Sequence, residues 1–267
     1  MAQTAGECKS MNIQGFDIFR NHGFISHLIR VLALGFMCTS VTHADPKVYS
    51  PRVEKDELAF ENRGNTTIDD DDSRDGTQRH VFEIEYGVTD WWKTAVVARL
   101  DKSATGSLRY DTTAWENILQ LTETGKYWLD AGLYLEYKLA DDDSDPDVFE
   151  SKILLEKYWH DYQNILNLTF EQELGSKGDD DLEFEYAWRT RRPISGHLKL
   201  GVEAFGKLGE LRDIRDLDDQ EHRIGPVLYH EFGIGPVEIE YSLAWLFGLT
   251  DATPDNTFRW QIEIPLD

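Results

Sequence analysis

The chain has 267 residues and a formal net charge of −23, from 50 acidic and 27 basic side chains. So large an excess of acid repels nucleic acid and offers no general phosphate-binding surface, which excludes nucleic-acid partners. The length suits a single domain, and the two cysteines, Cys8 and Cys38, both lie near the start of the chain. The rest of the sequence therefore has no disulfide or thiol chemistry.

Residues 1–44 have the layout of a secretory signal peptide. Arg30 precedes the apolar run at 31–37, and Thr42 and Ala44 place small residues at the usual cleavage positions. The apolar run is shorter than the roughly 20 residues that a membrane-spanning helix needs. We expect cleavage near Ala44, followed by a periplasmic N-terminal segment at 45–56.

From residue 57 onward, apolar and polar side chains alternate in successive segments. In one of them, Leu133, Leu135 and Leu139 share a face with Tyr137, while Glu136 lies on the other. A period of two predicts β-strands with one apolar and one polar face. We expect about twelve strands, at 57–63, 77–88, 92–101, 108–122, 127–139, 148–159, 162–174, 181–191, 196–208, 221–232, 236–247 and 258–266.

The links between these strands are short and long in strict alternation. Thr89-Asp90 and His160-Asp161 are short, whereas 64–76 and 209–220 are long. Tight periplasmic turns and longer extracellular loops are typical of outer-membrane barrels. The sequence therefore predicts an all-β fold, a single antiparallel up-and-down transmembrane β-barrel over 57–267, in the bacterial outer membrane.

The width of such a barrel decides which face points inward. Side chains fill the interior of about eight strands, so a dozen strands leave an apolar interior too wide to pack. Turned the other way, the apolar face meets lipid and the charged face lines the lumen. The candidate pore-lining residues are Glu83, Glu85, Glu136, Glu171, Glu183, Glu185, Glu238, Glu240, Lys93, Arg99, Lys138, Arg189, Arg223 and Arg259.

Two interpretations of this charged lumen stay open. A water-filled lumen rich in carboxylates predicts a narrow channel for small polar or cationic solutes. An internal lattice of salt bridges would instead plug the barrel and leave it a structural or surface-binding role through its acidic loops. A soluble periplasmic β-protein with glutamate-rich faces in water is a third alternative.

Aromatic residues fall near the predicted strand ends, where a bilayer boundary favours amphipathic rings. The candidates for this membrane interface are Trp91, Trp92, Trp128, Trp159, Tyr162, Trp188, Trp245 and Trp260. Outer-membrane lipids and lipopolysaccharide are the partners that such a surface implies. The sequence does not indicate an oligomeric state.

Acidic runs occupy the long links, as at 69–72, 141–143 and 179–181. The simplest interpretation is solvated loop tips. Clustered carboxylates also suit divalent cations, which could join these loops to lipopolysaccharide phosphates. No segment has the spacing of a calcium-binding loop, so we assign no metal ligand and expect no other cofactor.

The sequence shows no catalytic constellation. His197 lies two residues from Ser195, but no third group is indicated that would orient a base. Phosphate loops, zinc-spaced Cys/His sets and dinucleotide fingerprints are absent from the sequence. We therefore expect a protein that is not an enzyme, with an outer-membrane lipid hydrolase as the alternative.

The stretch Phe82-Glu83-Ile84-Glu85-Tyr86-Gly87-Val88-Thr89-Asp90-Trp91-Trp92 resembles glutamate-bearing hairpins of uncharacterised proteobacterial outer-membrane proteins of transporter or porin type. The resemblance implies an outer-membrane location and passage of a solute that it does not name. For an outer-membrane barrel we also expect the barrel-assembly machinery as a partner.

Overall fold

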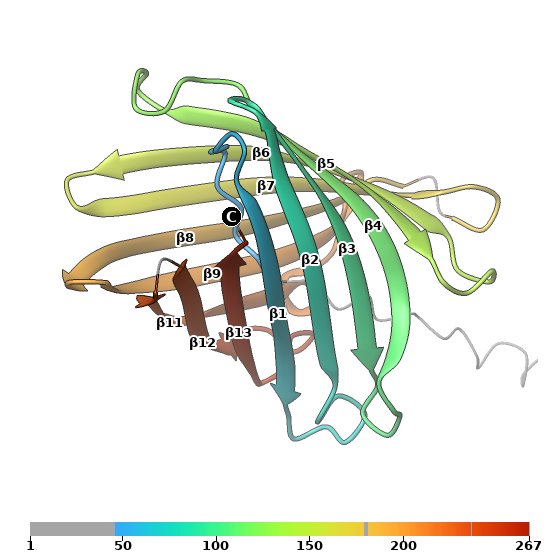
Figure 1. The fold of residues 1–267 in the computed structure, drawn as a ribbon. Helices are drawn as coiled ribbons and strands as arrows, with labels where there is room; N and C mark the ends of the chain where they lie inside the picture. The colour runs from blue at the N-terminus through green and yellow to red at the C-terminus, as the bar shows by residue number, and fades with distance from the viewer. Residues whose placement is uncertain (1–45, 179–180, 236, 267) are drawn as a thin grey trace, which may run out of the picture. The chain divides into compact units, whose positions relative to one another are not determined.

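The computed structural model describes residues 46–178, 181–235 and 237–266, and these form a β-barrel (Figure 1). Twelve long strands make the wall, and a two-residue strand, β10, and a short 3₁₀ helix, η1, lie in one loop. The elements are β1 (Leu58–Ile68), β2 (Gln78–Thr89), β3 (Trp92–Lys102), β4 (Arg109–Gln120), β5 (Asp130–Ala140), β6 (Asp147–Trp159), β7 (Tyr162–Leu174), β8 (Glu183–Ser195), β9 (Leu198–Glu210), β10 (Asp213–Ile214), η1 (Leu217–Asp219), β11 (Glu221–Ile234), β12 (Val237–Gly248) and β13 (Asn256–Pro265).

Each long strand pairs antiparallel with the next along the chain, and β13 pairs with β1 to close the ring. In that closing pair, Phe60 lies opposite Ile264 and Thr66 opposite Phe258. Closure leaves no free edge strand, which is the condition for a sheet to cross a bilayer. The prediction of a single up-and-down antiparallel barrel of about twelve strands is confirmed.

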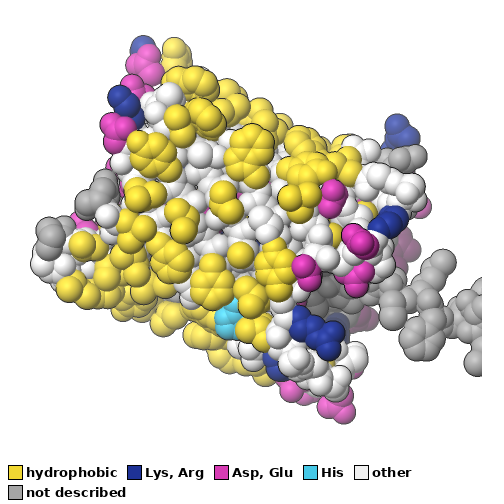
Figure 2. Space-filling view, turned by 45° about the vertical axis from the view of Figure 1, so that its right-hand side comes forward, with side chains coloured by type: hydrophobic (Ala, Val, Ile, Leu, Met, Phe, Trp, Pro, Cys, Tyr) yellow, Lys and Arg dark blue, Asp and Glu magenta, His cyan; other side chains and the backbone are white. Residues whose placement is uncertain are grey.

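The two faces of the wall follow the predicted alternation. On β2, Phe82, Ile84 and Tyr86 are exposed on the outside, whereas Glu83 and Glu85 between them are buried inside. Figure 2 shows apolar side chains spread over the outer wall, with charged side chains gathered toward its margins. The apolar face is therefore outermost, as lipid contact requires. Within the described residues, no helix is long and apolar enough to cross a membrane.

The strand boundaries differ most from the prediction at three places. β1 continues to Ile68, past Gly64, where a loop was expected. β8 runs through Pro193 to Ser195, and a register shift between these two residues accommodates a proline that cannot donate to the ladder. The β4–β5 link spans 121–129 and is not a short turn, so the strict alternation of short and long links was wrong at this point.

The longer β4–β5 link is held by polar side chains at the strand ends. The side-chain amide of Gln120 donates to the Thr122 carbonyl at 2.8 Å, and the Asp130 carboxylate accepts from the Gly125 amide at 2.8 Å. These bonds satisfy backbone groups that would otherwise continue the ladder between β4 and β5. The β4–β5 link is consequently longer than the short turn that the alternation of links predicts.

Candidate functional site in the barrel lumen

The first described residues of the chain, 46–53, lie inside the barrel; we name them the lumen segment. In Figure 1 this stretch runs within the ring of strands, behind β1. Its central residue is Tyr49, whose backbone amide donates to the Asn167 side chain at 2.8 Å and whose carbonyl accepts from the same side chain at 2.9 Å. Asn167 on β7 is fully buried and thus serves as a two-pronged anchor for the segment backbone.

Further polar contacts extend the anchoring toward the mouth of the barrel that carries the short turns. The Ser50 hydroxyl donates to Glu156 at 2.7 Å, and the Val53 amide donates to the Gln120 side chain at 2.9 Å. Arg52 pairs with Glu156 at 2.8 Å. The inner wall therefore supplies hydrogen-bond partners to both the backbone and the side chains of the segment. The prediction of a periplasmic segment at 45–56 did not anticipate these contacts.

Two apolar clusters inside the lumen receive the segment. Val48 packs in a cluster that includes Phe205, Val227 and Leu246, from β9, β11 and β12. On the other side, Tyr49 packs with Ile118, Tyr134 and Leu154, from β4, β5 and β6. Apolar side chains on the polar face of a membrane barrel would be costly against water, and the segment covers them. The segment and these two clusters form a small hydrophobic core within a charged lumen.

The wall is shaped to admit the segment at two glycines. A Cβ atom on Gly132 would lie 2.8 Å from the Pro51 Cβ, and one on Gly87 would lie 1.8 Å from the Glu54 carbonyl oxygen. Gly87 also donates its amide to the Glu57 carbonyl at 2.9 Å and accepts from the Asp56 amide at 2.8 Å. Glycine here permits close backbone approach. The path of the chain into the lumen is thus built into the strands themselves.

Lys47 carries the central charge of the lumen segment. Its ammonium group lies 3.0 Å from Glu61 and 3.0 Å from Glu83, and all three side chains are almost fully buried. Burial alone would lower the pKa of Lys47, but the two carboxylates hold it well above its ordinary value. Burial, followed by the nearby Glu116 carboxylate, raises the pKa of the Tyr49 phenol, so Tyr49 stays protonated.

Glutamates on neighbouring strands lie directly opposite one another in two runs. One run crosses β11, β12, β13, β1 and β2, and the other crosses β4 to β9. The first contains Glu231, Glu240, Glu263, Glu61 and Glu83; the second contains Glu116, Glu136, Glu150, Glu171, Glu183 and Glu210. Like charges paired across strands destabilise a sheet, so each run needs cations beside it.

Basic side chains supply that compensation. Arg63 pairs with Glu61 and Glu83, and Arg99 pairs with Glu136. Lys138 lies 3.0 Å from Glu150 and 2.7 Å from Glu171. Lys207 pairs with Glu183, Lys199 with Glu231, and Arg191 with Glu240 at 3.0 Å. The result is the salt-bridge lattice that the sequence allowed as one of two interpretations of the lumen.

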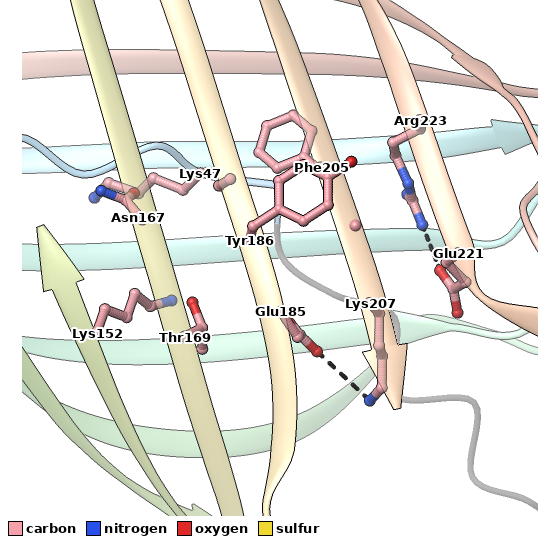
Figure 3. A pocket seen from close by; sticks show the side chains of 12 residues that line it. Lys47, Lys152, Asn167, Thr169, Glu185, Tyr186, Phe205, Lys207, Glu221 and Arg223 are labelled. Atoms are coloured by element: carbon pink, nitrogen blue, oxygen red, sulfur yellow. Dashed lines mark hydrogen bonds and ion pairs between the residues drawn. The ribbon is translucent and has the colours of Figure 1, made fainter. Parts of the chain in front are cut away.

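Lys47 borders two cavities inside the barrel. The larger, of about 330 Å³, lies toward the short-turn mouth between the lumen segment and strands that include β8, β12 and β13. The smaller, of about 30 Å³, is shown in Figure 3. Beside it, Glu185 lies 3.6 Å from Lys207, and Arg223 lies 2.7 Å from Glu221. The smaller space holds only one or two waters.

The predicted pore-lining residues are placed mainly in the lattice and around the cavities. Glu83, Glu136, Arg99 and Arg259 are buried in the lumen, and Glu85, Lys93, Arg189 and Glu240 line the larger cavity. Glu185 and Arg223 line the smaller one, whereas Glu171, Glu183 and Lys138 take part in the ion pairs above. Glu238 lies at the rim, 3.5 Å from His197. That these residues line a conducting path stays a prediction.

The lumen segment and its anchor residues are what the sequence reasoning missed. Inward-facing Tyr134, Leu154, Phe205 and Leu246 interrupt the polar face of their strands. Apolar residues at lumen positions are the signal that an apolar occupant fills the barrel. The segment itself is too short for a periodic pattern, and its anchor Asn167 lies 118 residues away in sequence.

Most of the predicted interface aromatics lie near strand ends and links, but Trp188 lies in the middle of β8 and Trp260 in the middle of β13. Trp91, Trp128 and Trp159 are strongly exposed, and Tyr162 and Trp245 are exposed to a lesser degree. Trp92, Trp188 and Trp260 are partly buried, and Trp260 packs over Gly64 on the neighbouring strand. Contact of these rings with lipid headgroups stays a prediction.

The histidines contact groups other than serine. His222 lies 3.1 Å from the Tyr186 hydroxyl and 2.8 Å from Gln220, and His80 lies 3.3 Å from Gln78. His197 is next to Glu231 and Glu238 at the rim. Among the described residues, no histidine ring is within hydrogen-bonding distance of a serine hydroxyl, so a serine–histidine pair is not formed there.

The acidic loops contain aspartates that cap their own turns. The Asp71 carboxylate accepts from the Ser73 amide at 2.9 Å, and Asp142 accepts from the Ser144 amide at 2.8 Å. These backbone bonds lower the pKa of both aspartates. The geometry is that of solvated loop tips with local turns, and divalent cations at these loops stay a prediction.

Comparison with known proteins gives structural matches alone. No protein-family model and no curated protein sequence matches the chain. An outer-membrane channel from Pseudomonas putida F1 is similar in structure, with a TM-score of 0.57 and 12% identity, over 84% of this chain and 99% of that one. The NanC porin is similar with a TM-score of 0.54 and 8% identity, over 78% of this chain and 99% of that one. The fold is therefore that of outer-membrane barrel proteins.

Proposed function

We propose that the chain is an outer-membrane barrel that serves as a narrow channel for small polar solutes, with a preference for cations. The apolar outer wall and the structural likeness to outer-membrane channels support the membrane location. The observation that carries the channel is the pair of cavities on either side of Lys47. A water path through the barrel is thus interrupted at the lumen segment, and a local shift of that segment would join the two spaces.

The preference for cations follows from the charge of the lumen. Among the fully buried charged side chains of the described residues, carboxylates outnumber cations. Rings of carboxylates favour positive solutes by lowering the electrostatic barrier to their entry. Asn167 and Lys47, which hold the lumen segment, would set how often the path opens.

The test is single-channel recording in planar bilayers, with the wild type compared with Asn167→Leu. The substitution removes both hydrogen bonds to the Tyr49 backbone, so we expect openings to be more frequent and cation-selective in a KCl gradient. Asn164→Leu makes the same change three residues away on the outer, lipid-facing side of β7 and should record like the wild type. A wild type and an N167L variant that are both silent in the bilayer, although both are folded, would contradict the channel.

A second candidate is a permanently plugged barrel with a structural or surface-binding role through its acidic loops. It is favoured by the number of buried contacts that the lumen segment makes, from Lys47 to Val53. The recordings separate the two candidates, since a permanent plug conducts in neither variant. Neither candidate is an enzyme, and lipopolysaccharide bridged by divalent cations would be the partner of the loops in both.

A further inference from the structure

The larger cavity of the lumen has the size and chemistry of a small-molecule site. Its volume of about 330 Å³ lies at the lower end of the range for ligand pockets, roughly 300–1,000 Å³. It is bordered by the lumen segment, by β8, β11, β12 and β13, and by residues of β1 to β4. Its lining is mainly polar, and most of the charges in it are paired: Lys93 with Glu85 at 2.8 Å and Arg191 with Glu240 at 3.0 Å.

Glu263 on β13 belongs to the run of opposed glutamates but is not part of these ion pairs. In the run of opposed glutamates from β11 to β2, Glu231 pairs with Lys199, Glu240 with Arg191, and Glu61 and Glu83 with Lys47. Within the part of the chain that the structure describes, the carboxylate of Glu263 forms no ion pair or hydrogen bond, although it lines the cavity. Its neighbours across the sheet, Glu61 and Glu240, repel it.

Arg189 on β8 is a cation of the same cavity that has no carboxylate as an ion-pair partner within the described residues. Its guanidinium lies over the Tyr229 ring, 5.6 Å from the ring centroid, and its Nε is buried without an acceptor. Among the described residues no carboxylate forms an ion pair with it, although it borders the same cavity. Three strands, β9, β11 and β12, lie between β8 and β13 in the sheet, so Arg189 and Glu263 line different walls.

We propose that this cavity binds small zwitterions, molecules of the amino-acid and short-peptide class, with the carboxylate on Arg189 and the ammonium group on Glu263. The proposal rests on the channel function and names its solute class. Charge-assisted hydrogen bonds to both ends of the solute would give Arg189 and Glu263 the ion-pair partners that they lack among the described residues. A net-neutral solute also leaves the charge balance of the lumen unchanged, whereas a simple anion meets Glu263 and a simple cation meets Arg189.

The test is calorimetric titration of the purified, folded protein in detergent with probes that separate the two charges. Glycine, 4-aminobutyrate, 6-aminohexanoate and glycylglycine are the zwitterions, and acetate and methylammonium are the single charges. We expect at least one zwitterion to bind about tenfold or more tightly than either single charge. The best spacing between ammonium and carboxylate measures the separation of Arg189 from Glu263.

Two variants identify the residues. We expect Arg189→Gln and Glu263→Gln each to weaken zwitterion binding about tenfold or more. Arg189→Gln should improve methylammonium binding, and Glu263→Gln should improve acetate binding, because each removes the repelling charge. Arg192→Gln, on the outer side of β8, and Glu123→Gln, in the β4–β5 link, are matched changes of charge that should leave affinity unchanged.

The outcomes decide the binding proposal separately from the channel. Zwitterions that bind no better than acetate or methylammonium, or that bind equally to R189Q and E263Q, would overturn the site. Selective zwitterion binding by a barrel that never conducts would support the site and remove the channel function. Conductance without zwitterion binding would support the channel function and overturn the site.

Discussion

At the scale of the residue, Lys47 links the lumen segment to the wall. It is the one charge of the segment that touches Glu61 and Glu83, and it borders both cavities. Breaking a buried ion pair by removing one partner leaves the other charge uncompensated. Glu61 and Glu83 would then keep their ion pairs with Arg63, and Glu61 would keep the hydrogen bond from Gln261. The consequence should be a lumen segment that leaves its site more often.

Lys47→Met tests this role. The predicted mature chain has no cysteine, so a Ser50→Cys reporter can be labelled with a water-soluble maleimide. We expect labelling to be at least about tenfold faster when Lys47→Met is added to the reporter, because loss of a charged hydrogen bond costs about 1.5–3 kcal/mol. Lys55→Met, at an exposed position nearer the rim, is the control and should not change the rate. Equal labelling rates in all three proteins would show that Lys47 does not hold the segment.

The charge of Lys47 also sets a pH dependence. Its pKa in the folded protein is raised above the ordinary value of 10.5, so its stabilising effect is complete below pH 10.5 and is lost as the pH rises through the folded pKa. The thiolate of the reporter itself forms between pH 7 and pH 10, so its labelling rate is divided by that of free cysteine with the same probe at the same pH. We expect this relative rate for the Ser50→Cys reporter to be flat from pH 7 to pH 10 and to rise above that. A rise in the relative rate that begins near pH 8 would contradict the raised pKa.

Gly132 is the second residue on which the segment depends. A side chain there would collide with Pro51, so Gly132→Val should expel the segment while the barrel still closes. We expect faster labelling at Ser50→Cys, at a cost to folding stability of about 1–3 kcal/mol. Gly233→Val, where the nearest atom to an added Cβ is 3.9 Å away, is the control. Unchanged labelling in G132V would mean that the barrel wall moves to accept the new side chain and that the segment stays in place.

At the scale of the element, the lumen-facing side of a strand carries both charged and apolar side chains. On β12, Glu240 is polar as expected, but Ala244 and Leu246 on the same face are buried against Val48 and Phe205. The strands of this membrane barrel thus contribute to an internal core as well as to an external apolar surface. A lipid-facing leucine and a lumen-facing leucine on β12 should therefore differ in their contribution to stability.

Leu246→Ala and Leu243→Ala make that comparison on one strand. Leu246 is fully buried, whereas Leu243 is 41% exposed on the outside. We expect Leu246→Ala to lower the free energy of unfolding by about 2–4 kcal/mol, because it opens a cavity in the internal core. Leu243→Ala should cost distinctly less, as lipid or detergent can follow the shortened side chain. Reversible urea unfolding in detergent measures both, and equal losses would argue against an internal core.

The division between charged and apolar residues on the lumen-facing side also decides how much of the molecule the sequence predicts. The period of two predicts twelve strands with two distinct faces, because the alternation is a local property of each strand. The width of a barrel of twelve strands was needed as well to predict the inward direction of Glu83, Glu136 and Arg99. The predicted strands for β4 and β5 extended too far into their link, because Gln120 and Asp130 cap a loop that alternation cannot detect. The lumen segment was not predicted, because its anchors, Asn167 and Glu156, are more than a hundred residues from it.

At the scale of the whole barrel, the account depends on one orientation of the sheet. With the apolar face outward, the charged residues form the lumen lattice, and the aromatic residues at the strand ends lie at the level of lipid headgroups. With that face inward, a ring of twelve strands would enclose an apolar space too wide to fill. The buried Glu83 and the exposed Ile84 next to it fix the orientation in the structure.

The measurement that tests this orientation most directly is fractionation of the exported protein, followed by gel electrophoresis with and without boiling. The account predicts recovery in the outer membrane and a band that shifts in mobility only after boiling, as a closed, inserted barrel requires. Recovery in the soluble periplasm, with no heat-dependent shift, would contradict it and would make every lumen residue described above a surface residue.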